Sequence, residues 1–137
     1  MPKQKSCSNL MEALYQYCKN INDWPASWEI VEEDIVVGEV LTEQFKLFLL
    51  DRIEKEQTKK TIKIHAQYLW VLGGELIRKI NEDEDDAERR LSAKELILKY
   101  IDNSGGPYWC HANDELDHAR YDSVCKQLFK FMIENPH

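Results

Sequence analysis

The sequence has 137 residues, of which 43% are hydrophobic, and a formal net charge of −7. A chain of this length and composition can bury a core of its own, so we expect residues 1–137 to form a single domain. The negative charge argues against a protein that coats nucleic acid non-specifically, because the field of an acidic protein repels phosphates.

The N-terminal stretch and the cysteines indicate a cellular compartment. Residues 1–20 contain lysines but no continuous apolar stretch after them, so they do not resemble a signal peptide. The sequence has no run of about 18 apolar residues that could cross a membrane. Four cysteines without a signal peptide are typical of reduced thiols. We therefore expect a cytoplasmic protein without a membrane partner.

The first part of the chain predicts one helix and then an irregular region. Apolar residues recur at helical spacing over residues 9–20, and Ser8 is placed to cap that helix. Asn22, Asp23 and the pair Trp24-Pro25 are expected to end it. Residues 28–38 contain two short β-branched runs that could be extended, although neither is long enough to build a sheet.

Two long helices are predicted next. The second helix is expected from after Gly38 to about Glu56, and the third begins after Thr58, its predicted N-cap. The apolar stripe of the third helix alternates at spacings of four and three: Ile62, Ala66, Leu69, Gly73, Leu76 and Ile80. A glycine inside a helix costs about 1 kcal/mol relative to alanine. We therefore expect the second helix to run antiparallel to the third and to cross it closely at Ala66 and Gly73.

The last part of the chain predicts two more helices. Residues 81–90 are highly charged and are expected to form a solvated acidic linker or a frayed helix end. Ser92 is placed to cap a fourth helix, which the glycine-rich residues 103–107 end. Asn113 is the predicted cap of the last helix, whose apolar face carries Tyr121, Val124, Cys125, Leu128 and Met132. The expected fold is thus all-α, a single compact bundle of about five helices.

Charge is strongly segregated along the chain. Residues 21–43 contain seven acidic residues and no lysine or arginine. Residues 44–80 contain eight basic and four acidic residues, a local charge of +4, and residues 81–96 return to −4. The start of the third predicted helix therefore lies in the one sizeable basic block of an acidic protein.

The same region carries a resemblance to a known family. Residues 45–49, Phe-Lys-Leu-Phe-Leu, followed by a brief break and then Thr58-Lys59-Lys60-Thr61-Ile62 at the start of a long helix, resemble the core-binding domain of tyrosine recombinases and phage integrases. The resemblance covers residues 40–80 well and the rest loosely. The chain also resembles an uncharacterised bacterial family that shares the segment Trp-Val-Leu-Gly-Gly-Glu at residues 70–75.

The resemblance implies a helical domain that clasps duplex DNA. Unpaired N–H groups and the helix dipole make the start of the third helix a reasonable position for phosphate. The predicted DNA-binding residues are Lys55, Lys59, Lys60, Thr61 and Lys63. The alternative interpretation, which the overall negative charge favours, is that these lysines are a solvated helix start facing the acidic segments of the same chain. Recombinases cut DNA with a separate C-terminal domain that supplies an arginine, a histidine and a tyrosine, and this sequence has no room for one. We therefore expect a non-catalytic domain without a cofactor.

Two other groups of residues leave alternatives open. Cys110, His111, His118 and Cys125 are potential zinc ligands, but paired Cys-x-x-Cys spacing is missing, so buried thiols and ordinary histidines are the preferred interpretation. The acidic residues around His118 are explained by the preference of helix starts for negative charge. The loop tryptophans are expected to cover the edges of the core, and exposure of two of them together would instead indicate a surface that anchors a partner. Such a surface, together with the acidic segments, is the basis of the alternative function, a protein-interaction or self-association module that binds no nucleic acid.

Overall fold

The computed structural model describes residues 7–135 and is all-α there, as predicted. The described residues contain six α-helices and two 3-10 helices and no β-strand, with one isolated bridge between Asp102 and Gly105. In chain order the elements are α1 (Cys7–Tyr17), η1 (Ile21–Asp23), α2 (Trp24–Trp28), α3 (Asp34–Glu54), α4 (Lys59–Glu82), η2 (Glu88–Arg90), α5 (Ala93–Tyr100) and α6 (Glu115–Glu134).

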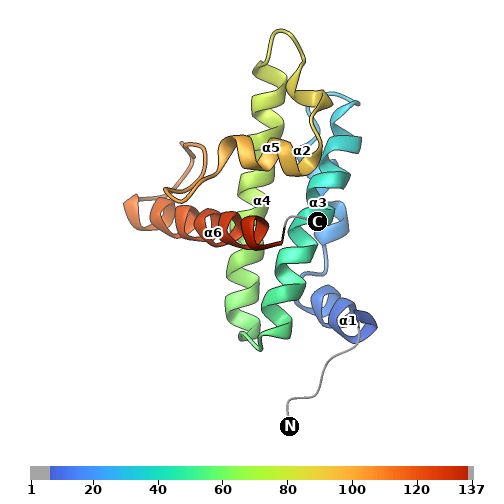
Figure 1. Ribbon diagram of the computed structural model, residues 1–137, viewed down its shortest axis with the longest axis vertical. Helices are drawn as coiled ribbons and strands as arrows, with labels where there is room; N and C mark the ends of the chain where they lie inside the picture. The colour runs from blue at the N-terminus through green and yellow to red at the C-terminus, as the bar shows by residue number, and fades with distance from the viewer. Residues whose placement is uncertain (1–6, 136–137) are drawn as a thin grey trace.

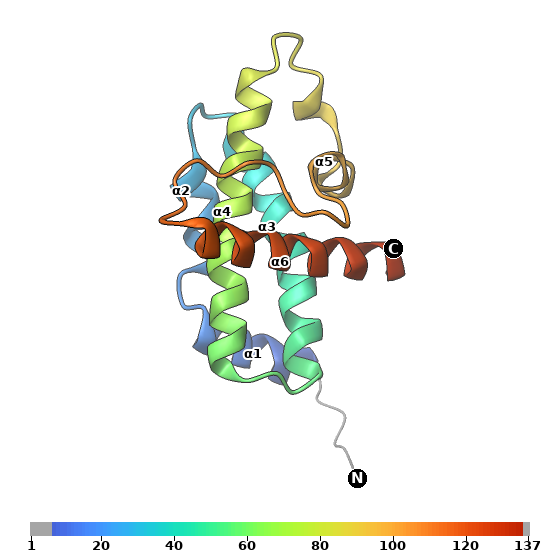
Figure 2. The same ribbon diagram turned by 90° about the vertical axis from the view of Figure 1, so that its left-hand side faces the viewer.

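An antiparallel hairpin of the two longest helices, α3 and α4, runs along the long axis of the molecule (Figure 1). Helix α6 crosses this hairpin, while α2 and α5 lie on opposite sides of it (Figure 2). Most of the largest fully buried side chains come from α3, α4 and α6, among them Phe45, Phe48, Leu69, Leu72 and Tyr121. The predicted pairing of the second and third helices is therefore confirmed, and a third long helix completes the core.

The glycine prediction is correct about close packing but wrong about the partner. Every residue of the predicted α4 stripe is buried, Gly73 included. The group that lies against Gly73 is the side chain of Trp28, because a Cβ built on Gly73 would come within 2.2 Å of Trp28 Cζ2. Gly38 of α3 is approached in the same way by Pro25, at 2.9 Å. The glycines thus allow α2 to pack closely against both long helices.

The first helix ends before Trp24-Pro25, as predicted, but the expectation that these two residues lie in a loop is wrong. These residues begin α2, since a proline in the first helical turn lacks only an N–H that would have no partner there. Trp24 and Trp28 are both buried, with ring centroids 5.9 Å apart, and each also packs on Phe45. The two tryptophans therefore belong to the core and are not available to a protein partner.

The possible extended segment at residues 28–38 is also corrected. Helix α3 already begins at Asp34, so Gly38 lies inside the helix rather than before it. Asp34 is fully buried, and its carboxylate accepts hydrogen bonds from the backbone N–H groups of Ile30 and Val31, both at 2.9 Å. This turn positions the start of the helix, and burial of Val37 with Leu41 then outweighs the β-branched preference of the run.

The predicted caps of α4 and α5 are confirmed and two others are corrected. Thr58 accepts a hydrogen bond from the Thr61 N–H, and Ser92 forms a full capping box with Glu95. The N-cap of α6 is Asp114 rather than Asn113, because the carboxylate of Asp114 accepts from the Asp117 N–H at 2.8 Å. Ser8 lies within α1 and therefore does not precede the helix.

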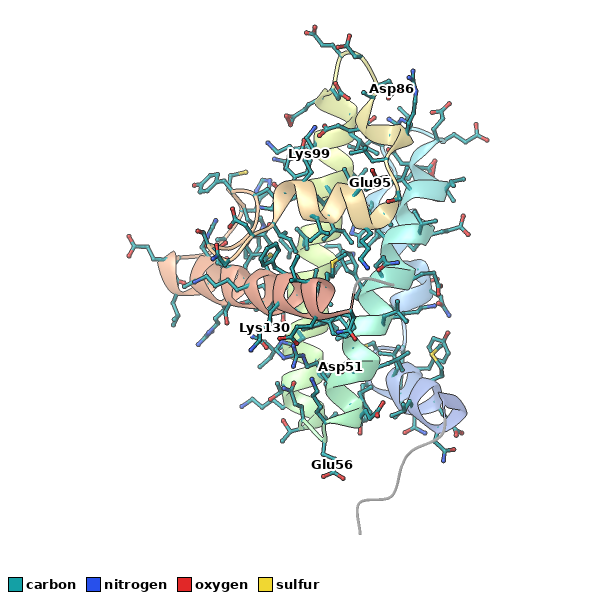
Figure 3. The ribbon with its side chains drawn as sticks, in the orientation of Figure 1. Asp51, Glu56, Asp86, Glu95, Lys99 and Lys130 are labelled. Atoms are coloured by element: carbon teal, nitrogen blue, oxygen red, sulfur yellow. The ribbon has the colours of Figure 1, made fainter. Side chains whose placement is uncertain are left out.

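Residues 81–90 are only partly a solvated linker. They contain the last residues of α4, an exposed turn and η2. Glu88 is buried and accepts a hydrogen bond from Tyr100, while Arg89 forms an ion pair with the buried Asp34. Asp86 and Glu56, which both have positive φ angles of 56° and 62°, mark the turns at opposite ends of the molecule (Figure 3).

Candidate nucleic-acid interface

The turn after α3 places three of the predicted lysines around one surface hollow. Lys59, Lys60 and Lys63 line it together with Ile64 and Gln67, and its volume is about 510 Å³. All three lysines are exposed. They converge because residues 59 and 63 are one helical turn apart, with residue 60 beside them.

The ammonium groups of these three lysines are not paired with carboxylates of the described residues. Within residues 7–135 no ion pair involves Lys59, Lys60 or Lys63. The ammonium group of Lys59 lies 5.8 Å from the centre of the Tyr17 ring, a cation–π contact that holds the side chain over α1. An anion that approaches the start of α4 would therefore not have to displace a carboxylate.

The structure separates Lys55 from the other lysines. Its ammonium group forms an ion pair with Asp51 at 3.1 Å, one turn back along α3, and it does not line the hollow. Thr61 is half-buried, and its hydroxyl oxygen accepts a hydrogen bond from the Thr58 hydroxyl at 3.0 Å. Thr61 keeps its own hydroxyl proton as a donor. Thr61 can therefore donate a hydrogen bond to a ligand, whereas the ammonium group of Lys55 is already paired.

A second groove adjoins the hollow and was missed from the sequence. It lies between α4 and the segment η1–α2, has a volume of about 540 Å³ and shares Lys63 and Gln67 with the hollow. Its other lining residues include Tyr17, Trp24, Ser27 and Trp70. The sequence feature that could have indicated this groove is Trp70, which follows Lys63 by seven residues and hence lies on the same face of the helix.

The four potential zinc ligands lie in three different environments. His118 accepts a hydrogen bond from the Trp109 N–H at Nε2 (3.2 Å) and contacts Asp122 through Nδ1 (3.0 Å), so both ring nitrogens are engaged. Cys125 is buried beneath Gly106, and burial raises the pKa of its thiol to about 12. Cys110 and His111 contact Arg78. The described residues contain no cluster of three or more potential metal ligands.

Three acidic residues near His118 make structural contacts. Asp114 caps α6, and Asp122 accepts a hydrogen bond from the Gly106 N–H. Asp117 accepts a hydrogen bond from the Tyr68 hydroxyl, and this bond, followed by one from the Asn113 N–H, holds the pKa of Asp117 below its usual value. These carboxylates therefore tie the loop before α6 to α4 and α6.

An exposed apolar stripe lies elsewhere, on the outer face of α3. Val36, Val40 and Leu47 are 65%, 43% and 47% exposed. They follow one another at spacings of four and seven residues, so they share one face of the helix. Shallow grooves flank this stripe on either side of Gln44, one towards α5 and one towards α1 and α6.

Comparisons with known proteins found no match to this chain. No protein-family model matches the chain, and no match was found among curated proteins or solved structures. The resemblance of residues 40–80 to recombinase core-binding domains thus stays a prediction. Within residues 7–135, none of the helices has the length and apolar character required to span a membrane.

Proposed function

We propose that this chain binds DNA weakly through the phosphate backbone, with Lys59, Lys60 and Lys63 as the contacting residues. The observation that carries the proposal is that the three lysines surround one hollow and form no ion pairs among the described residues. Thr61 adds a hydroxyl donor at the same helix start. Lys55 has a smaller part, because its ammonium group is already paired with Asp51.

The number of phosphate contacts sets the expected dependence of the affinity on salt concentration. Each phosphate contact contributes about −0.9 to the slope of log affinity against log salt concentration. Three contacts therefore predict a slope of about −2.7, which is roughly a 40-fold loss of affinity between 50 and 200 mM salt. The net charge of −7 opposes approach to DNA, so we expect measurable binding only at low salt. Contacts of this kind position a protein without reading sequence.

A titration of duplex DNA at 50 and 200 mM salt tests the proposal. The wild type should bind at low salt, and Lys59→Glu/Lys60→Glu/Lys63→Glu should bind far more weakly. A matched control, Arg90→Glu/Lys126→Glu/Lys130→Glu, changes the net charge equally at exposed positions outside the hollow and should bind like the wild type. Equal losses in both variants, or no wild-type binding at low salt, would contradict the proposal.

The exposed stripe on α3 favours a second candidate function, self-association. An apolar patch on a small protein is stabilised when another surface covers it. Val36, Val40 and Leu47 form such a patch, whereas the buried tryptophans do not. Sedimentation velocity over a range of protein concentrations tests this candidate. Self-association that Val40→Glu/Leu47→Glu abolishes would support it, and a strict monomer at all concentrations would exclude it.

A further inference from the structure

The groove beside the lysines has aromatic walls. Tyr17, Trp24 and Trp70 contribute to its lining, and Lys63 and Gln67 connect it to the hollow that Lys59 and Lys60 border. Its volume of about 540 Å³ lies within the range of about 300–1,000 Å³ that is usual for small-molecule sites. Helices α2 and α4, which form its sides, are in direct contact.

Trp70 is exposed but held in place. Its ring N–H donates a hydrogen bond to the Ser27 hydroxyl at 2.9 Å, and its backbone carbonyl accepts one from the Trp28 ring N–H, also at 2.9 Å. The indole nevertheless remains 43% exposed. A fixed and accessible aromatic surface loses little entropy when another ring stacks on it. Trp70 therefore has the properties of a stacking platform.

The polar lining of the groove includes both a cation and a carboxylate. Lys63 and Trp70 are seven residues apart, which is about 10.5 Å along the helix at 1.5 Å per residue. Lys63 lines both the groove and the basic hollow, whereas Asn20 and Asp23 line the groove alone. A phosphate is attracted to Lys63 and repelled by Asp23. The amino groups of cytosine and adenine, in contrast, donate hydrogen bonds that a carboxylate can accept.

We propose that this groove takes an unpaired nucleobase, stacked on Trp70, from a single DNA strand whose phosphates lie on Lys59, Lys60 and Lys63. The proposal rests on the phosphate contacts proposed above and names the form of DNA that they hold. A base inside a duplex cannot reach the groove unless it leaves the stack, which requires energy. Basic channels with aromatic platforms are the usual means of holding single strands. The preferred partner is therefore single-stranded DNA.

Three DNA probes test the proposal on the wild-type protein at 50 mM salt. They are a single strand of mixed sequence, the same strand annealed to its complement, and a strand of equal length whose sugars carry no bases. We expect the single strand to bind at least fivefold more tightly than either of the others, the gain that one stacked base provides. Equal binding of the single strand and the base-free strand would overturn the proposal, and this comparison requires no variant.

Variants then locate the base. Trp70→Ala should weaken binding of the single strand at least fivefold and leave binding of the base-free strand unchanged, while Trp70→Phe, which keeps a ring but loses the hydrogen bond to Ser27, should bind more tightly than Trp70→Ala. Tyr108→Ala is the control, because Tyr108 is 75% exposed but stacks on His118 outside this groove. If Trp70→Ala binds normally and the triple lysine variant does not, the base site is wrong and the phosphate contacts stand. If no probe binds at all, both proposals fall.

Discussion

Gly73 and Gly74 are neighbours in α4 with different surroundings. A Cβ on Gly73 would lie 2.2 Å from Trp28 Cζ2, whereas a Cβ on Gly74 would lie 3.5 Å from Trp28 Cδ1, an ordinary contact. We predict that Gly73→Ala lowers the free energy of unfolding by about 1–3 kcal/mol through overpacking. Gly74→Ala should raise it by up to about 1 kcal/mol, because alanine is the better helix former. Urea unfolding of both variants measures the difference.

The partner of Gly73 can be identified with one further substitution. If Trp28 is the obstacle, Trp28→Leu should reduce the loss that Gly73→Ala causes, and the two substitutions should be strongly non-additive. Additive losses would show that some other group limits the space at Gly73. The sequence predicted the close approach from the glycine on an apolar stripe. It could not identify Trp28, because the two residues are 45 positions apart in the chain.

His65 makes stability depend on pH. Burial first, and the nearby Arg52 second, lower the pKa of His65 below its usual 6.5. The unfolded chain therefore binds a proton more readily, and stability should fall as the pH drops from about 7 through 6.5 towards the folded-state pKa, then level off. The slope cannot exceed about 1.4 kcal/mol per pH unit for one group. Urea unfolding between pH 8 and pH 5 should show this decline.

A variant and a control assign that decline to His65. His65→Phe removes the titrating group and should flatten the pH dependence, whereas His111→Gln, at an exposed position, should keep it. An unchanged decline in His65→Phe would place the responsible group elsewhere. The helical spacing of His65 gave no indication of this effect, since only the packed structure shows its ring against Phe48 with Nδ1 unpartnered and buried.

At the scale of elements, one carboxylate connects three helices. Asp34 begins α3, accepts hydrogen bonds from Asn81 at the end of α4 (3.0 Å) and forms an ion pair with Arg89 of η2. Burial alone would raise the pKa of Asp34, but the bonds from Arg89, the backbone and Asn81 together lower it. The carboxylate therefore stays charged, and its partners depend on that charge.

Removing this carboxylate should be severe. We predict that Asp34→Ala lowers the free energy of unfolding by roughly 3–5 kcal/mol, because it leaves Arg89 without its buried partner. Asp86→Ala is the matched control, since it removes the other partner of Arg89, which is largely exposed, and should cost below about 1 kcal/mol. Thermal unfolding of the two variants compares them directly. Similar losses would mean that the buried pair has no special role.

The elements that the sequence predicted well are those with long apolar stripes. Helix α4 and the capped start of α5 follow from local pattern and capping chemistry alone. Helix α2 is five residues long, too short to be stable by itself, and it forms because Trp28 packs against Gly73. The start of α3 likewise depends on Asn81 and Arg89, which are distant in the chain. Long-range contacts therefore decided the helix that sequence analysis missed, α2, and the helix start that it misplaced, that of α3.

For the whole molecule, the sequence predicted the position of only part of the candidate surface. The sequence predicted that Lys59, Lys60 and Lys63 lie close together, because they are at most four residues apart on one helix. The groove that extends from them was not predictable, because Tyr17, Ser27 and Trp70 come from three elements. Helical periodicity places residues on a face of their own helix, but it does not say which other helix stands opposite.

The arrangement of α6 also makes a prediction about the whole chain. This helix crosses both arms of the α3–α4 hairpin (Figure 2), and its Tyr121 and Leu128 are fully buried while Phe131 packs on Phe48 of α3. Without α6 the hairpin would expose a large apolar face to water.

We predict that a chain ending at Gly105 loses cooperative unfolding, whereas a chain ending at Asn135 keeps it. Calorimetry and circular dichroism should give coincident transitions for the longer chain and no sharp transition for the shorter one. A sharp transition in the shorter chain would show that residues before α6 fold alone, and the single-domain prediction would then be wrong.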